Sequence, residues 1–188
     1  YLQPKIWTIF TMKILGLLFL SISLFGIDQA KHASNQEILA KVIEEELASG
    51  TFLLNRVHQI AEMLMKKGFA IDAYSVPSLS YEKFPLWEGE SLSIPLTIFA
   101  YVWPPHSGNY SATSIHSHPI PCAFAVLDGA LTQENYVLVS NTQKIARMTD
   151  EEVFQKFEGP IDDLEEPFIH RIYSKGSHAI SLHIYGLP

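Results

Sequence analysis

Residues 114–131 read SIHSHPIPCAFAVLDGAL, and this stretch decides the fold that the sequence predicts. His116 and His118 stand two apart in a segment with strand character, and side chains two apart on a strand project to the same face. An apolar run beginning at Cys122 then leads to an Asp-Gly pair at 128–129, a strong hairpin signal. The stretch therefore predicts paired strands and two imidazoles aimed at one point, an arrangement that suits a metal ion.

The sequence around this stretch is rich in short apolar runs. Val, Ile, Tyr and Phe recur between Pro and Gly, and strands are predicted at 69–74, 96–103, 112–116, 122–127, 136–139, 167–173 and 178–185. Many short strands at close spacing indicate an antiparallel sandwich or barrel. Residues 81–90 are predicted to be a loop or edge segment. The Thr149 and Glu152 pair predicts one short helix over 149–157.

Two helices are predicted before the strands. Ser34 and Glu37 form a capping-box pattern, and apolar residues at helical spacing follow until Gly50. A second amphipathic helix over 52–67 is predicted to end at Gly68, where cations favour the negative helix end and glycine accepts a left-handed turn. We expect both helices to pack on one face of the strands.

The first thirty residues resemble a leader. Residues 14–25 form an uncharged run preceded by Lys13, which is the layout of a secretory signal. We therefore expect a signal peptide or leader over 1–30 and one domain over 31–188, with an uncleaved anchor or a buried core segment as alternatives. Cleavage would make the protein secreted or periplasmic, and otherwise it would be cytoplasmic.

The composition excludes several classes of protein. Of 188 residues, 47% are hydrophobic and 18% are charged, which excludes a disordered chain. The net charge is -7 and no block of Lys and Arg occurs, so we expect neither a nucleic-acid partner nor a stable membrane partner beyond the leader. One cysteine allows no intrachain disulfide.

Two later histidines extend the candidate metal site. His170 lies in the predicted strand 167–173 and is a candidate third ligand, while His183 lies in the last predicted strand. A paired histidine motif alone is also typical of surface histidines or hydrogen-bonded core histidines. The chemical interpretation therefore depends on the surrounding residues.

Those surroundings resemble the first motif of the cupin barrel. Three residues separate His118 from Cys122 and six more separate Cys122 from Gly129, which is the cupin spacing with cysteine in place of an acidic ligand. The cysteine dioxygenases make this replacement, and the sequence resembles that family in two blocks, 114–131 and 168–188. Together the blocks cover roughly a third of the chain.

The resemblance implies a mostly β fold, a cupin (double-stranded β-helix or jelly-roll) barrel with N-terminal α-helices. It implies an iron-dependent enzyme that uses Fe(II) and O2 to oxidise cysteine or a related small thiol to its sulfinic acid. We expect a monomer, although the sequence does not reveal the oligomeric state. The implied site consists of three metal ligands (His116, His118, His170), a thioether cross-link (Cys122, Tyr185) and a hydrogen-bonded relay that orients the tyrosine (Ser181, His183, Tyr185).

The substrate end of the implied site departs from the family. Cysteine dioxygenases hold the substrate carboxylate with Arg in a Tyr-x-Arg segment, and the matching residues here are Tyr81 and Lys83. Lysine offers a point charge in place of a planar fork. Lys83 also has the alternative interpretation of an ordinary surface cation. Cysteine, mercaptopropionate and cysteamine remain open as substrates.

Two other functions fit the same histidines. A cupin that is exported and binds a metal or small ligand without turnover would need no relay beside the metal. A zinc hydrolase could also use three histidines with one open position, but it would need a general base near the metal.

Overall fold

The computed structural model describes residues 27–48, 54–89, 96–105, 111–140, 145–162 and 169–186. The expected leader over 1–30 therefore lies almost entirely outside the described residues, as does Gly50. Within the described ranges, no helix has both the length and the apolar character required to cross a bilayer.

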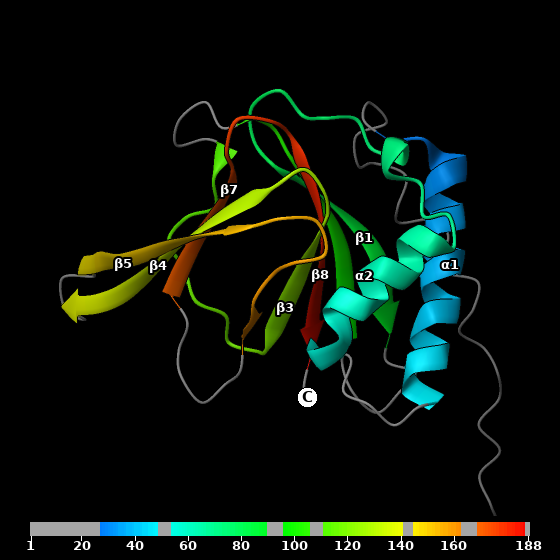
Figure 1. Ribbon diagram of the computed structural model, residues 1–188, viewed down its shortest axis with the longest axis horizontal. Coiled ribbons are helices and arrows are strands. Elements are labelled where there is room, and N and C mark those ends of the chain that lie inside the picture. The colour runs from blue at the N-terminus through cyan, green and yellow to red at the C-terminus, as the bar shows by residue number, and fades with distance from the viewer. Residues whose placement is uncertain are drawn as a thin grey trace, which may run out of the picture.

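Two antiparallel sheets form the body of the protein (Figure 1). The larger sheet has the strand order β1-β2-β8-β3-β6 and the smaller has the order β5-β4-β7. The strands are β1 (Glu82–Gly89), β2 (Leu96–Trp103), β3 (Cys122–Asp128), β4 (Leu131–Ser140), β5 (Ile145–Phe154), β6 (Ile161–Asp162), β7 (Ile169–Ser174) and β8 (Ala179–Gly186).

Two helices cover the outer face of the larger sheet (Figure 1). Helices α1 (Gln29–Ala48) and α2 (Val57–Lys66) are accompanied by short 3-10 turns at Leu54–Arg56 and Ile71–Ala73. Apolar side chains of α1 and α2 form one buried cluster with alternate residues of β2, β3 and β8. A second buried cluster lies on the other face of the larger sheet and joins it to the smaller sheet.

Strand β8 lies at the centre of the larger sheet, between β2 and β3. Ile180, Leu182 and Ile184 belong to the cluster that contacts the helices. Side chains alternate between the two faces of a strand. The intervening residues at 181, 183 and 185 therefore face the space between the sheets.

The predicted fold class, mostly β with N-terminal helices, is confirmed. Strand β2 has the predicted bounds, and 81–90 contains the edge strand β1. The second helix also ends as predicted: the Lys67 N–H donates to the Met63 carbonyl, and Gly68 adopts a φ of 90°.

The predicted start of the first helix at Ser34 is wrong. Helix α1 begins at Gln29, because the Asp28 carboxylate accepts hydrogen bonds from the backbone N–H groups of Ala30 and Lys31. An aspartate at this position satisfies donors that the first helical turn leaves open. The capping-box residues therefore lie inside the helix.

The predicted strand at 69–74 is a short turn. Asn35, fully buried on α1, donates from Nδ2 to the Ala70 carbonyl and accepts from the Ala70 N–H, at 3.0 and 2.7 Å. These two bonds occupy the backbone groups of Ala70 that a strand partner would use. The 3-10 turn at Ile71–Ala73 follows.

The predicted helix at 149–157 is also wrong, because most of this segment belongs to β5. Pairing with β4, the strand that directly precedes β5, outweighs the local capping pattern. Thr149 does not cap a helix; its hydroxyl donates to the Asn135 carbonyl across the strand pair.

Two further expectations around the histidine motif are wrong. The segment 112–116 is not a strand, and His116 and His118 lie in a loop beside Pro119 and Pro121, which have no N–H to donate to a ladder. Gly129 does adopt a left-handed turn, with a φ of 74°. That turn is no hairpin, because it connects β3 to β4, which belong to different sheets.

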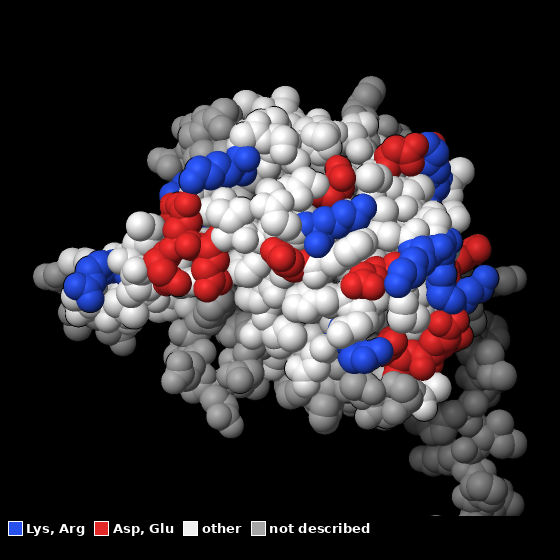
Figure 2. Space-filling model, in the orientation of Figure 1, with Lys and Arg blue, Asp and Glu red and all other residues white. Residues whose placement is uncertain are grey.

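Opposite charges are intermixed on the face shown in Figure 2. Lys67 and Glu45 form an ion pair of 2.9 Å between α2 and α1, and Arg56 contacts the buried Glu46 at 3.0 Å. These pairs connect the two helices to each other and to the turn between them.

Candidate metal centre and its pocket

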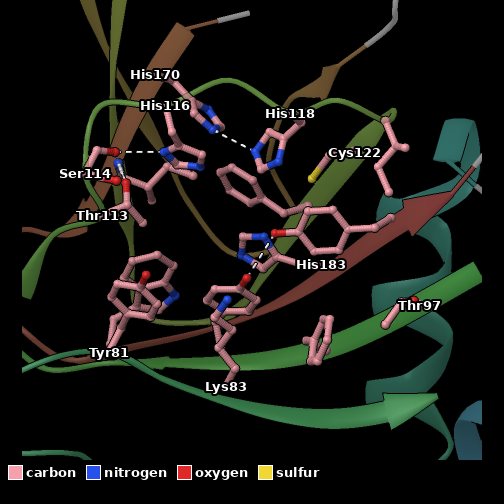
Figure 3. A pocket seen from close by; sticks show the side chains of 17 residues that line it. Tyr81, Lys83, Thr97, Thr113, Ser114, His116, His118, Cys122, His170 and His183 are labelled. Atoms are coloured by element: carbon pink, nitrogen blue, oxygen red, sulfur yellow. Dashed lines mark hydrogen bonds between the residues drawn. The ribbon is translucent and has the colours of Figure 1, made fainter. Parts of the chain in front are cut away.

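Three histidines converge at one end of the space between the sheets (Figure 3). The nitrogen atoms that His116, His118 and His170 can offer to a metal lie within 4.8 Å of one another. His118 Nε2 and His170 Nε2 are 3.0 Å apart. Two nitrogens held about 2.1 Å from one ion at right angles would have a separation of about 3.0 Å. This group could therefore hold a metal ion.

The backbone brings two of these histidines together. His116 forms an isolated antiparallel bridge with His170 of β7, in which each N–H donates to the other carbonyl, at 3.0 and 2.9 Å. The loop that carries the histidine motif is therefore attached to the smaller sheet at the site itself.

Hydrogen bonds select the nitrogen atoms that face the site. The Nδ1–H of His116 donates to the Ser114 carbonyl at 2.7 Å, and the Nδ1–H of His170 donates to Gln133 Oε1 at 3.1 Å. In a neutral imidazole the other nitrogen then carries the lone pair. Both Nε2 atoms are thus prepared as ligands, and such outer hydrogen bonds are typical of metal-binding histidines.

The site favours neutral imidazoles. Burial, followed by the neighbouring His116 and Lys83, lowers the pKa of His118 to about 4. Burial likewise lowers the pKa of His170 to about 3, with smaller effects from His116 and His118. Near neutral pH these side chains are therefore unprotonated, as a metal ligand must be.

A pocket of about 620 Å³ opens beside the three histidines. Its wall is largely aromatic, with side chains from β2, β3 and β8. Lys83 is the only lysine or arginine among the described residues that line it, and no described aspartate or glutamate does so. Among the described residues, the lining of the pocket therefore combines one lysine with three clustered histidines and contains no aspartate or glutamate.

Both predicted substrate-binding residues line this pocket. Lys83 lies across it from the three histidines (Figure 3), with its Nζ 5.5 Å from the centre of the Tyr101 ring. Tyr81 stacks near Trp103 and Tyr101, with ring centres 5.0 and 5.8 Å apart.

The predicted relay of Ser181, His183 and Tyr185 forms only in part. Trp103 Nε1–H donates to Ser181 Oγ at 2.8 Å, and Ser181 Oγ lies 2.9 Å from His183 Nε2. The Tyr185 hydroxyl does not extend this series through His183. It lies 3.0 Å from the hydroxyl of Tyr101.

The predicted cross-link pair occupies facing positions. Cys122 of β3 is the cross-strand partner of Tyr185 of β8, and its thiol is buried at the pocket wall. Burial, followed by the neighbouring thiol, raises the pKa of Tyr185 well above its usual value. The two side chains are adjacent, and whether they join covalently remains a prediction.

Sequence reasoning missed two residues of the site. Gln133 is fully buried and orients His170, but it falls in the part of β4 that the strand prediction omitted. A polar residue two positions after the buried Leu131 was the available signal, because both face the same side of a strand. Tyr101 was inside a correctly predicted strand, but its contact with Tyr185 depends on the pairing of β2 with β8.

Comparisons with known proteins bear on the fold. No protein-family model matches the chain, and no curated protein matches it significantly. Similar solved structures include a cupin-superfamily sugar phosphate isomerase from Silicibacter pomeroyi, which is 14% identical with a TM-score of 0.41. The match covers 57% of this chain and 59% of the isomerase chain.

Two other similar structures cover more of the chain. A DMSP lyase is 9% identical with a TM-score of 0.49, covering 82% of this chain and 93% of that chain. An RmlC-like cupin protein from Methanocaldococcus jannaschii is 9% identical with a TM-score of 0.42, covering 61% and 86%. At these values the likenesses carry no argument about the reaction. The two antiparallel sheets and the outer helices agree with the predicted mostly β fold, and membership of the cupins stays a prediction.

Proposed function

We propose that this protein is an iron-dependent thiol dioxygenase that converts cysteine or a related small thiol to its sulfinic acid. The observation that carries the proposal is the three-histidine group at a pocket that also contains Lys83, Cys122 and Tyr185. The resemblance to the cysteine dioxygenases in blocks 114–131 and 168–188 supports the same activity.

The donor set fits iron(II). Three neutral imidazoles leave the charge of a divalent ion uncompensated, and imidazole is a suitable ligand for iron. Bound there, iron(II) would supply open coordination positions for a thiolate and dioxygen and would favour the deprotonated thiol. Both His116 and His170 present Nε2 for this role, because their Nδ1–H groups are engaged elsewhere.

The other residues of the pocket bind and orient the substrate. Lys83 would pair with a substrate carboxylate, because it is the only lysine or arginine among the described lining residues. The aromatic side chains of Tyr81, Trp103 and Phe99 line the same pocket and would give the substrate a partly apolar wall. The Tyr185 hydroxyl, protonated at neutral pH, can donate a hydrogen bond towards the substrate.

The reaction needs no added reductant. Both oxygen atoms of one O2 join the sulfur of RSH to give RSO2H, so the sulfur loses four electrons and the dioxygen gains four. Holding the two reactants side by side can remove roughly 7–11 kcal/mol of the barrier in favourable cases.

The test loads the full-length chain with iron(II) under anaerobic conditions and measures oxygen uptake with cysteine, 3-mercaptopropionate and cysteamine. We expect one sulfinate for each O2 consumed with at least one thiol. His170→Ala should lose metal and uptake together, whereas His178→Ala, a surface histidine paired with Asp128, should keep both.

Two other outcomes would overturn the proposal. Tight metal binding without oxygen uptake would favour a binding protein, and ester hydrolysis by the zinc-loaded chain would favour a hydrolase. The cross-link has its own test, since Cys122→Ala or Tyr185→Phe should abolish any mobility shift on a denaturing gel.

A further inference from the structure

We propose that Tyr101 is a positioning residue that holds the Tyr185 hydroxyl in place, an inference that rests on the proposed function. The hydroxyl groups of the two tyrosines lie 3.0 Å apart. Tyr101 is on β2, directly opposite Ser181 of β8 in the strand register, so the pairing of these strands fixes its position.

The predicted relay would orient Tyr185 through the imidazole of His183, whose Nε2 is hydrogen-bonded to Ser181 Oγ. Trp103 Nε1 can only donate, so Ser181 Oγ accepts its hydrogen bond, and Ser181 Oγ is also hydrogen-bonded to His183 Nε2. The rings of His183 and Tyr185 have centres 6.2 Å apart and are nearly parallel. The hydroxyl that lies beside the Tyr185 hydroxyl is therefore that of Tyr101.

Tyr101 also contacts both His183, which belongs to the Trp103–Ser181–His183 series, and Tyr185, which that series does not reach. Its ring stacks on His183 with centres 4.0 Å apart, and Phe124 stacks on His183 at 4.9 Å. Tyr101 thus contacts the series that begins at Trp103 through its ring and contacts Tyr185 through its hydroxyl. Burial raises the pKa of Tyr101 to about 12, so this hydroxyl keeps its proton at neutral pH.

The same ring lies beside the substrate anchor. Lys83 Nζ is 5.5 Å from the centre of the Tyr101 ring, within the range of a cation–π contact. Removing only the hydroxyl of Tyr101 would leave this contact and the stacking on His183 intact. Tyr101→Phe should therefore change how Tyr185 acts in the reaction without changing how the thiol binds.

The first test is a double-mutant cycle on the metal-free, full-length chain. Tyr101→Phe, Tyr185→Phe and the double variant are unfolded in urea, and we expect the shifts of the single variants not to add, because they remove one shared hydrogen bond. Tyr173 provides a control, since its hydroxyl bonds Glu151 at 3.1 Å. Tyr173→Phe and Tyr185→Phe should be additive. Additivity of Tyr101→Phe and Tyr185→Phe would overturn the contact.

The second test is kinetic. With iron and the preferred thiol, Tyr101→Phe should lower kcat by roughly 10–100-fold, the range seen when an outer hydrogen-bond partner is removed. The thiol KM should stay unchanged, and the kcat losses of Tyr101→Phe and Tyr185→Phe should not multiply. An unchanged kcat, or a loss confined to KM, would overturn the positioning role. Should the wild-type chain oxidise no thiol, the proposed function fails, and the urea cycle still decides whether Tyr101 holds Tyr185.

Discussion

Gln133→Leu should weaken metal binding without unfolding the protein. Gln133 is fully buried on β4, accepts the His170 Nδ1–H at 3.1 Å and donates to Asn135 Oδ1 at 2.9 Å. Leucine fills a similar space but cannot accept a hydrogen bond. His170 would then lose the bond that fixes its tautomer and ring orientation.

Two general magnitudes give the expected loss of metal affinity. Depriving a buried donor of its acceptor costs about 1–3 kcal/mol. Removing an outer partner of a metal-binding histidine weakens affinity by about 10–100-fold, which corresponds to about 1.4–2.8 kcal/mol. Because the two ranges overlap, we expect the dissociation constant to rise by about one to two powers of ten.

The assay is anaerobic titration calorimetry with iron(II), with near-ultraviolet circular dichroism to verify the fold. The matched control is Thr132→Val on the same strand, a fully buried residue whose hydroxyl has no hydrogen-bond partner in the described part of the chain. It should leave affinity unchanged. Equal affinity for wild type and Gln133→Leu, or an equal loss in Thr132→Val, would refute the reasoning.

Three further predictions concern stability. Asn35→Leu should lower the free energy of unfolding by about 2–5 kcal/mol in urea, because both backbone groups of Ala70 lose their partner; a loss below 1 kcal/mol would contradict this. Gly129→Ala should lower the free energy of unfolding more than Gly176→Ala. Both glycines have positive φ, but of these two only Gly129 would place a Cβ against a backbone carbonyl oxygen, at 2.3 Å. Gly176→Ala should lower the free energy of unfolding by about 1–2 kcal/mol, and equal losses in the two variants would contradict the prediction. Burial raises the pKa of Tyr74 to about 12, so the contribution of this pKa shift to stability is complete below pH 10 and is lost as the pH rises through 12. In Tyr74→Phe, the loss of unfolding free energy at alkaline pH should be smaller by about 2–3 kcal/mol. An unchanged dependence of stability on pH would contradict this prediction.

Local sequence patterns predicted the elements that local interactions determine. The bounds of β2 and the end of α2 at Lys66 were predicted because strand character and a lysine-glycine end can be read within a few residues. The segment 149–157 was misassigned because its structure depends on β4, ten or more residues away. The true start of α1 depended on Asp28, which lay within the expected leader.

The candidate site shows the same division. His116, His118 and His170 lie close together, as predicted. His116 and His118 lie on a loop and not on the expected strand, and the isolated bridge between His116 and His170 holds that loop at the site. Gln133 and Tyr101 reach the site through strand pairing. One sequence gives no information on which strands pair or in which register.

Because the side chains of β8 alternate between the helices and the pocket, the number of residues in this strand matters as well as their identity. Substitutions in 179–186 would act one position at a time. A single inserted or deleted residue would instead move the side chains on one side of it to the opposite face, so that apolar residues such as Ile184 face the pocket and polar ones face the helices. Length changes within this strand should therefore be far more damaging than most replacements. Engineering of the pocket is best directed at side chains and at the loops that flank the strand.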